Sequence, residues 1–211
     1  KKKALADRNM VAKRFFDDGR FHFFLLFSLS IPLNIGYAIL KTVYGFVLHS
    51  NWIVQNGVYY ALLTLMRFII IRGAEKNEED KALKLSSIIL SISSFHYLLM
   101  VLEMYLHTSS PHYPGYIVYV ASLYAFIKVG VAIKGCIKLK ITATPAIVAG
   151  NNLKISHAFV SLIFLESGML NIFGEGTEEE RLILLISGLV VVAYLFVSGP
   201  LLIVLNKRNK V

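Results

Sequence analysis

Lys and Arg in this chain are confined almost entirely to alternate gaps between six long apolar runs. Each run is about as long as an α-helix must be to cross the roughly 30 Å hydrocarbon core of a bilayer. Eighteen of the 22 basic residues lie before the first run, after the last, or at the gaps after the second and fourth. The pattern predicts an all-α, polytopic membrane bundle with six transmembrane helices, at about residues 21–48, 52–72, 83–107, 115–137, 154–173 and 182–205.

The same charge asymmetry predicts how the helices are oriented. The opposite gaps hold Asn51, the uncharged stretch 108–114 and the acidic stretch 175–180, and their one basic residue is Arg181 at a helix edge. Cytoplasmic loops carry the excess of Lys and Arg in membrane proteins. We therefore expect a multi-pass protein of the inner cell membrane with both termini in the cytoplasm. Residues 1–20 and 206–211 are basic tails, the first able to lie on an anionic leaflet, and 21–205 form the membrane domain.

Composition excludes several other classes of protein. A net charge of +9 in a soluble chain would suggest nucleic acid, but here the positive-inside pattern accounts for it, and no nucleic-acid partner is expected. The single Cys136 can form neither an internal disulfide nor a site with several thiolate ligands. The first apolar run is also too long for the apolar part of a cleavable signal peptide.

Ionisable side chains inside apolar runs cost a few kcal/mol near the bilayer centre, so they face the bundle interior, pair, or mark function. His96 and Glu166 are the deepest, each about twelve residues from the inner basic boundary, or roughly 18 Å of helical rise. The others are expected nearer the surface, where long side chains extend toward the headgroups. The full set is Lys41, Arg67, His96, Glu103, Lys128, His157 and Glu166.

The third run carries a polar stripe on one helical face, formed by His96, Met100, Glu103 and His107. Such a stripe can relay protons or bind a divalent metal. The three ligand candidates extend over about 16 Å of helical rise, however, so a single ion could not contact them all. Since no His-Glu-x-x-His motif is present, a packed polar stripe is favoured over a metal site.

Two further groups suggest a ligand. Amides and hydroxyls in the second run, Asn56 and Tyr60 among them, can bond across helices or line a polar cavity. In the fourth run Tyr124 and Lys128 are one turn apart, and an aromatic face beside a cation suits an anionic or aromatic ligand. The predicted ligand-binding residues are Glu166, Glu103, His96, Asn56, Tyr60 and Lys128.

In size, six spans and basic inner loops, the chain resembles the substrate-binding subunits of energy-coupling-factor vitamin transporters. Those subunits use an Ala-x-x-x-Ala motif in their first helix against the coupling partner. The first run here contains Ala38 alone. The likeness is one of architecture, and no family is assigned from it.

Three functional hypotheses remain open, since no nucleophile, phosphate-binding or channel-filter motif is present. In the first, the bundle binds or moves a small solute, with Glu166, Glu103 and His96 supplying charge or protons and an enclosed polar cavity joining Glu166 to the second helix. In the second, a filled bundle regulates or anchors a partner protein through loops 73–82 and 138–153. In the third, an intramembrane enzyme acts on lipid and places two or more ligands around one point.

Overall fold

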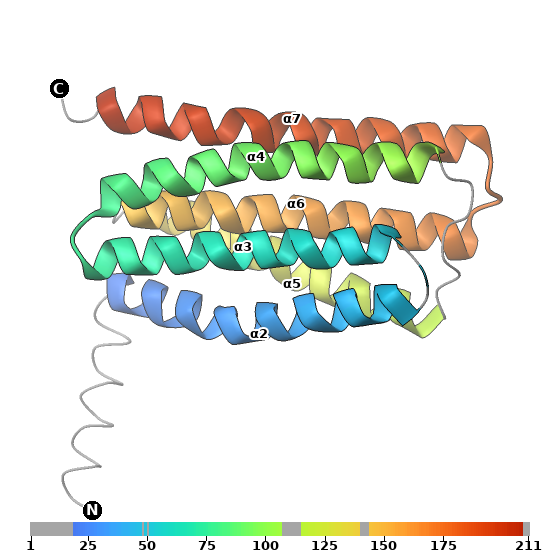
Figure 1. The fold of residues 1–211 in the computed structure, drawn as a ribbon, viewed down its shortest axis with the longest axis horizontal. Helices are drawn as coiled ribbons and strands as arrows, with labels where there is room; N and C mark the ends of the chain where they lie inside the picture. The colour runs from blue at the N-terminus through green and yellow to red at the C-terminus, as the bar shows by residue number, and fades with distance from the viewer. Residues whose placement is uncertain (1–18, 48, 50, 107–114, 140–143, 209–211) are drawn as a thin grey trace, which may run out of the picture.

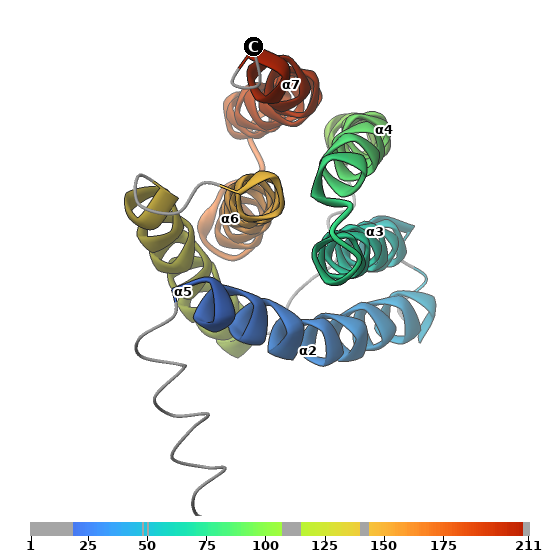
Figure 2. The ribbon, with the colours of Figure 1, turned by 90° about the vertical axis from the view of Figure 1, so that its left-hand side faces the viewer.

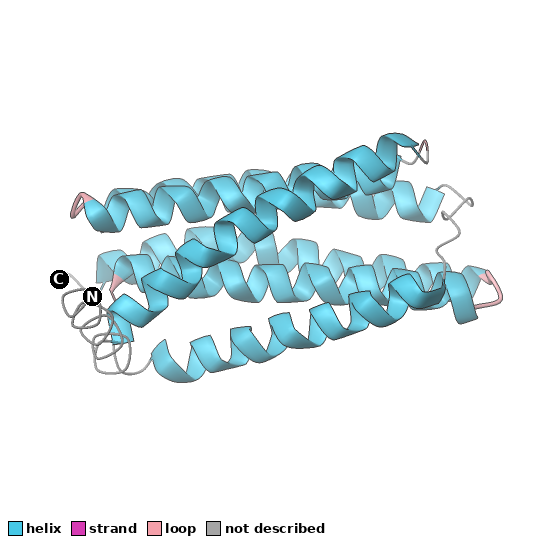
Figure 3. Cartoon of the chain, turned by 90° about the horizontal axis from the view of Figure 1, so that it is seen from below, coloured by secondary structure: helices cyan, strands magenta, loops and turns pink. Residues whose placement is uncertain are grey.

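A computed structural model describes residues 19–47, 49, 51–106, 115–139 and 144–208, and all regular structure in those ranges is helical (Figures 1 and 3). The prediction of an all-α fold is therefore confirmed. The six helices are α2 (Gly19–Val47), α3 (Asn51–Glu75), α4 (Glu79–Leu106), α5 (Gly115–Leu139), α6 (Pro145–Phe173) and α7 (Glu178–Arg208).

Five of these helices are long and apolar enough to cross a membrane. They are Phe23–Val47, Asn51–Glu75, Glu79–Leu106, Pro145–Phe173 and Glu178–Val204. Their outward faces carry large exposed apolar side chains, such as Leu33, Phe95 and Val190. Lipid is the environment in which such faces are stable, so the helices support a membrane protein.

Consecutive helices run in opposite directions (Figure 1). The start of α2, the end of α7 and the α3–α4 and α5–α6 connections therefore lie at one end of the bundle. These are the places where the sequence concentrates Lys and Arg. We call this the basic end, and the opposite one the acidic end.

Helix α6 is the centre of the arrangement. It packs against each of the other five helices, and the end view in Figure 2 shows it among them. The largest buried apolar side chains come from α3, α4, α6 and α7, and include Leu63, Met100, Val160 and Leu195. Helix α5 differs from the rest because its backbone packs against α6 alone.

Helices α2 and α3 form the tight antiparallel hairpin that the short connection predicts. A Cβ added at Gly45 would lie 2.7 Å from Val54, and one added at Gly57 would lie 3.0 Å from the Ala38 carbonyl oxygen. Glycine lets the two backbones approach this closely. The predicted packing of small residues between α4 and α7 is also found, since a Cβ at Gly199 would lie 2.6 Å from the Ser87 carbonyl oxygen.

The boundaries of the two basic connections were predicted wrongly. Helix α6 begins at Pro145 instead of residue 154, because Thr144 and Pro145 supply an N-cap and a first-turn proline. Residues 145–153 are thus helical, and Asn151 among them is buried. The predicted loop 138–153 shrinks to residues 140–144, of which 140–143 lie outside the described residues. Loop 73–82 likewise shrinks to residues 76–78.

The basic end is held together by carboxylates from the first turn of α4. Glu79 Oε2 accepts a hydrogen bond from the Ala146 backbone N–H at 3.2 Å, which satisfies a free amide at the start of α6. Asp80 Oδ1 accepts one from Asn206 Nδ2 near the end of α7, at 2.8 Å. One turn of α4 therefore ties the ends of two other helices.

Candidate functional site

A group of basic side chains and tyrosine rings lies inside the bundle, contributed by α2, α3, α5 and α6. We call it the cation–tyrosine cluster. It is built around hydrogen bonds to Arg67 and His157 and ring contacts to Lys41 and Lys128. Its members are Tyr37, Lys41, Tyr60, Arg67, Tyr124, Lys128 and His157.

Arg67 is the most enclosed charge in the cluster, with 3% of its surface exposed. Its Nη1 donates to Ser30 Oγ at 2.9 Å, and its Nη2 lies 3.1 Å from His157 Nδ1. Because arginine can only donate, His157 Nδ1 must accept, and its imidazole is neutral with the proton on Nε2. That proton points to the Tyr124 hydroxyl at 3.3 Å. The buried Arg67 Nε has no hydrogen-bond partner.

Lys41 is the second buried cation. Its Nζ donates to Asn56 Oδ1 at 2.9 Å and lies 3.4 Å from the centre of the Phe164 ring. The rings of Tyr37 and Tyr60 are 4.9 Å and 5.3 Å from the same nitrogen. An ammonium against aromatic faces gains a cation–π attraction of about 0.5–2 kcal/mol each, which offsets part of its lost hydration.

The tyrosines join the two buried cations into one site. The ring centre of Tyr60 is 4.8 Å from that of Tyr37 and 5.0 Å from that of His157. Tyr37 also stacks on Tyr124 at 5.4 Å, and Lys128 Nζ lies 4.8 Å from the Tyr124 ring. Every member is therefore linked to the next by a ring contact or a hydrogen bond.

The cluster carries positive charge without a described counter-charge. Within the described ranges, Lys41, Arg67 and Lys128 have only neutral hydrogen-bond and ring partners, and none lies within ion-pair distance of a carboxylate. Uncompensated buried charge is destabilising, because desolvation costs several kcal/mol per ion even after relaxation. The arrangement is therefore suited to a partner that brings negative charge.

The predicted ligand-binding residues fall into three separate groups. Asn56, Tyr60 and Lys128 belong to the cation–tyrosine cluster or contact it directly. His96 and Glu103 meet at Gln55 of α3: His96 Nε2 lies 3.1 Å from the Gln55 carbonyl oxygen, and Gln55 Nε2 donates to Glu103 Oε2.

Glu166 forms the third group. Its carboxylate accepts a hydrogen bond from Ser187 Oγ of α7 at 2.8 Å, on the side of α6 that faces α7. The structure thus gives Glu166 a neutral partner outside the cluster. The predicted grouping of Glu166 with Asn56 and Tyr60 is not seen in the described contacts.

Two members of the cluster were placed wrongly from the sequence. Arg67 was expected to extend to the headgroups and His157 to lie at the interface, yet both are buried. The error at His157 follows from the late start assigned to α6: measured from Pro145, His157 is twelve residues into the helix, or roughly 18 Å. For Arg67 a signal was present, since it continues the stripe of Asn56 and Tyr60 along one face of α3.

Lys41 was also expected to extend toward the surface, and it points inward instead. It lies six residues before the end of α2 at Val47. Asn56 meets it from the facing helix because the hairpin places α2 and α3 in close contact. A reader of the sequence sees the depth of Lys41 but not this partner.

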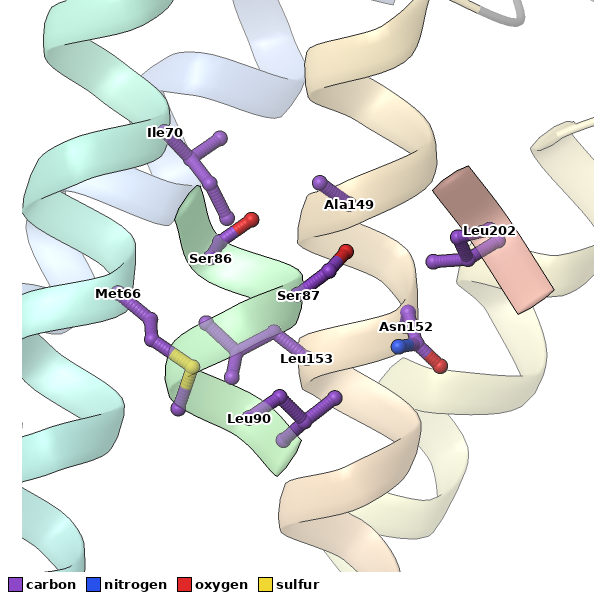
Figure 4. Close-up of a pocket in the computed structure, with 9 residues that line it drawn as sticks. All are labelled: Met66, Ile70, Ser86, Ser87, Leu90, Ala149, Asn152, Leu153 and Leu202. Carbon is purple, nitrogen blue, oxygen red and sulfur yellow. The ribbon is translucent and has the colours of Figure 1, made fainter. Parts of the chain in front are cut away.

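Two cavities lie among the described residues, each of about 10 Å³, which is room for about one water molecule. The first lies between α3, α4, α6 and α7 (Figure 4), where Asn152 bonds to Tyr194 and Ser198 of α7. The second adjoins Asn56 and Phe164. Neither joins Glu166 to α3, as solute handling had predicted.

The metal hypothesis gains no support from the geometry. No group of three His, Cys, Asp or Glu side chains suitable for a metal ion is found within the described ranges. Glu103 has Gln55 as its partner, whereas His107 and His112 lie outside the described residues.

No protein-family model, curated protein or solved structure matches this chain. Fold and site therefore define it by class alone: an all-helical protein with five helices able to span a membrane and a buried cationic site beside its central helix.

Proposed function

We propose that the protein binds or transports a small solute at the cation–tyrosine cluster. In this proposal α5 is the sixth span, the chain lies in the inner membrane, and the basic end with both termini faces the cytoplasm. The observation that carries the proposal is the burial of Arg67 and Lys41 with neutral partners only.

The argument rests on what a purely structural core would need. The apolar side chains around Arg67 already pack α3 against α6, as Leu63 and Val160 illustrate. An arginine at the centre of a spanning helix costs about 2.5–3.5 kcal/mol, and hydrogen bonds between helices return about 0.6–1.7 kcal/mol each. Two such bonds do no better than break even. A buried cation that stabilises so little supports a role in ligand binding.

The residues outside the cluster are assigned to the route from the acidic end. Gln55 lies in the second turn of α3, and it holds both His96 and Glu103. Glu166 is seven residues before the end of α6 at Phe173. In the proposal these groups supply charge or protons along that route, and Asn56 and Tyr60 position the solute beside Lys41.

The proposal is tested by solute retention. Purified protein in phosphatidylcholine nanodiscs is incubated with a mixture of small metabolites, and the solutes that remain after washing are identified by mass spectrometry. We expect wild type to retain at least one solute and Arg67→Gln to lose it. Arg72→Gln is the matched control, because Arg72 is exposed on the same helix. Retention of nothing by wild type, or equal retention by Arg67→Gln, would contradict the proposal.

A second candidate function is favoured by the small size of the cavities. A filled bundle is what a regulator or anchor of a partner protein would have, and the two cavities described hold about one water each. Its contact surface would be the exposed connection 76–78 and residues 140–144 at the basic end. This candidate predicts that replacing residues 76–78 with Gly-Ser-Gly abolishes activity in cells, while Arg67→Gln leaves it unchanged.

A further inference from the structure

We infer that the solute is a small organic oxyanion, a carboxylate or phosphate on a planar body, held by the Nε–Nη2 edge of Arg67. The inference rests on the proposed function and names the chemical class of its ligand. It depends on three features of the cation–tyrosine cluster: the unused donors, the missing negative charge and the aromatic faces.

The first feature is an excess of hydrogen-bond donors. On one edge of the Arg67 guanidinium, Nε has no partner and Nη2 is bonded only to the neutral His157. These two N–H groups are parallel, and they match the two oxygens of a carboxylate or phosphate. Lys41 Nζ carries three donors, of which Asn56 accepts one. An acceptor-only ligand satisfies such a site, whereas an amine would add more donors.

The second feature is charge. Lys41, Arg67 and Lys128 are linked through the rings of Tyr37, Tyr60 and Tyr124, and their described partners are neutral. In a low-dielectric interior, an oxyanion would be attracted by all three cations at once. A neutral solute would leave their cost in place, and a cationic solute would increase it.

The third feature is the shape of the surroundings. Three tyrosine rings and Phe164 lie between Lys41 and Arg67, with ring-centre separations near 5 Å where pairs are in contact. Aromatic faces pack best against flat groups. A planar body can replace one ring partner in these contacts, while a bulky aliphatic body would force the rings apart.

Two sources could provide an oxyanion: a dissolved solute or the headgroup of an anionic lipid. Arg67 lies eight residues before Glu75 at the end of α3, or about 12 Å of helical rise. That depth is within the hydrocarbon region, where headgroups do not normally reach. The dissolved anion is therefore the ligand inferred here, and the lipid is an arm of the test.

The test follows thermal unfolding in phosphatidylcholine nanodiscs, using the fluorescence of Trp52, the one tryptophan in the chain. The probes are benzoate and phenyl phosphate, with benzamide, benzylamine and cyclohexanecarboxylate as neutral, cationic and non-planar controls. We expect the two planar anions to raise the unfolding temperature and the controls to have smaller effects. Arg67→Lys, which loses the two-pronged edge, is expected to weaken anion binding at least about tenfold, and Arg72→Lys is the matched control.

A second variant guards against misfolding of Arg67→Lys. Lys128→Gln removes one cation from a half-buried position that has no described hydrogen bond, and it should weaken benzoate binding while keeping the protein monodisperse. Stabilisation by both planar anions that is lost in Arg67→Lys and reduced in Lys128→Gln would support the inference.

Other outcomes would overturn it in distinguishable ways. If benzamide stabilises as well as benzoate, or if the solutes retained through Arg67 are neutral or cationic, solute binding stands and the oxyanion is wrong. If phosphatidylglycerol added to the nanodiscs gives the Arg67-dependent shift and free anions give none, the dissolved ligand is wrong. If neither probe anion shifts wild type and no retained solute is an anion, the inference fails, and retention of nothing removes the proposed function as well.

Discussion

Replacing Gly57 with Ala should loosen the α2–α3 hairpin and destabilise the protein. The added methyl group would lie within contact distance of Thr42 Oγ1, and 3.0 Å from both the Ala38 carbonyl oxygen and the Thr42 backbone nitrogen. Ordinary contacts begin near 3.4 Å, and a backbone atom cannot move away by changing a rotamer. The two helices must therefore separate by a few tenths of an ångström at the point where Lys41 meets Asn56.

The size of the effect is set against a matched substitution on the facing helix. At Gly36 an added Cβ meets nothing within 4 Å. Both changes gain the same helix propensity, about 0.8–1 kcal/mol. The difference between Gly57→Ala and Gly36→Ala is therefore the overpacking alone, about 1–3 kcal/mol. For a chain of this length that corresponds to roughly 2–12 °C in the unfolding temperature.

Trp52 reports the transition because it is buried and stacks on Phe164, with ring centres 5.1 Å apart. Unfolding midpoints from its fluorescence should rank Gly57→Ala below both wild type and Gly36→Ala. Adding Thr42→Ala to Gly57→Ala should recover only part of the loss, because the side-chain clash is removed and the backbone clash remains. Equal midpoints for Gly57→Ala and Gly36→Ala would refute the close packing on which this reasoning rests.

Three further predictions concern other parts of the chain. Glu79→Ala removes the acceptor for the first amides of α6 and should lower stability by about 0.5–2 kcal/mol in thermal unfolding, with no such loss on replacing the exposed Glu75. Asn152→Ala should cost about 0.6–3 kcal/mol, measured likewise, because two hydroxyls on α7 lose their partner; a neutral result would contradict those bonds. In a Cys136→Ser background, a membrane-impermeant maleimide should label a cysteine at position 176 in intact cells but not one at position 77, and the opposite result would reverse the proposed orientation.

The sequence was sufficient for the architecture because lipid imposes simple rules. A helix that crosses lipid must be apolar along about twenty residues, and Lys and Arg avoid one side. Those rules predicted helical segments, the tight first hairpin and the packing of small residues between α4 and α7. They failed at Thr144 and Pro145, because a helix start signal inside a polar stretch resembles a loop. Helix α6 was therefore begun nine residues late.

The candidate site was harder to predict because it depends on which faces meet. Asn56, Tyr60 and Lys128 were selected from local polarity, and they lie at the cation–tyrosine cluster. Glu166 was selected from its depth alone, and rotation about the helix axis brings it to Ser187 instead. Depth can be counted along one helix, whereas the partner of Arg67 is ninety residues away in the chain and depends on the packing of α3 against α6.

The attachment of α5 has a consequence for how a molecule could exchange with the site. Its backbone packs on α6 alone, and its described link to α2 is the Tyr37–Tyr124 ring stack. Separating one aromatic pair costs about 0.5–1.5 kcal/mol, far less than parting two interlocked helices. Entry from the side between α2 and α5 would thus leave the interior seams of the bundle intact, and its rate would depend on the chemistry of a single pair of phenols.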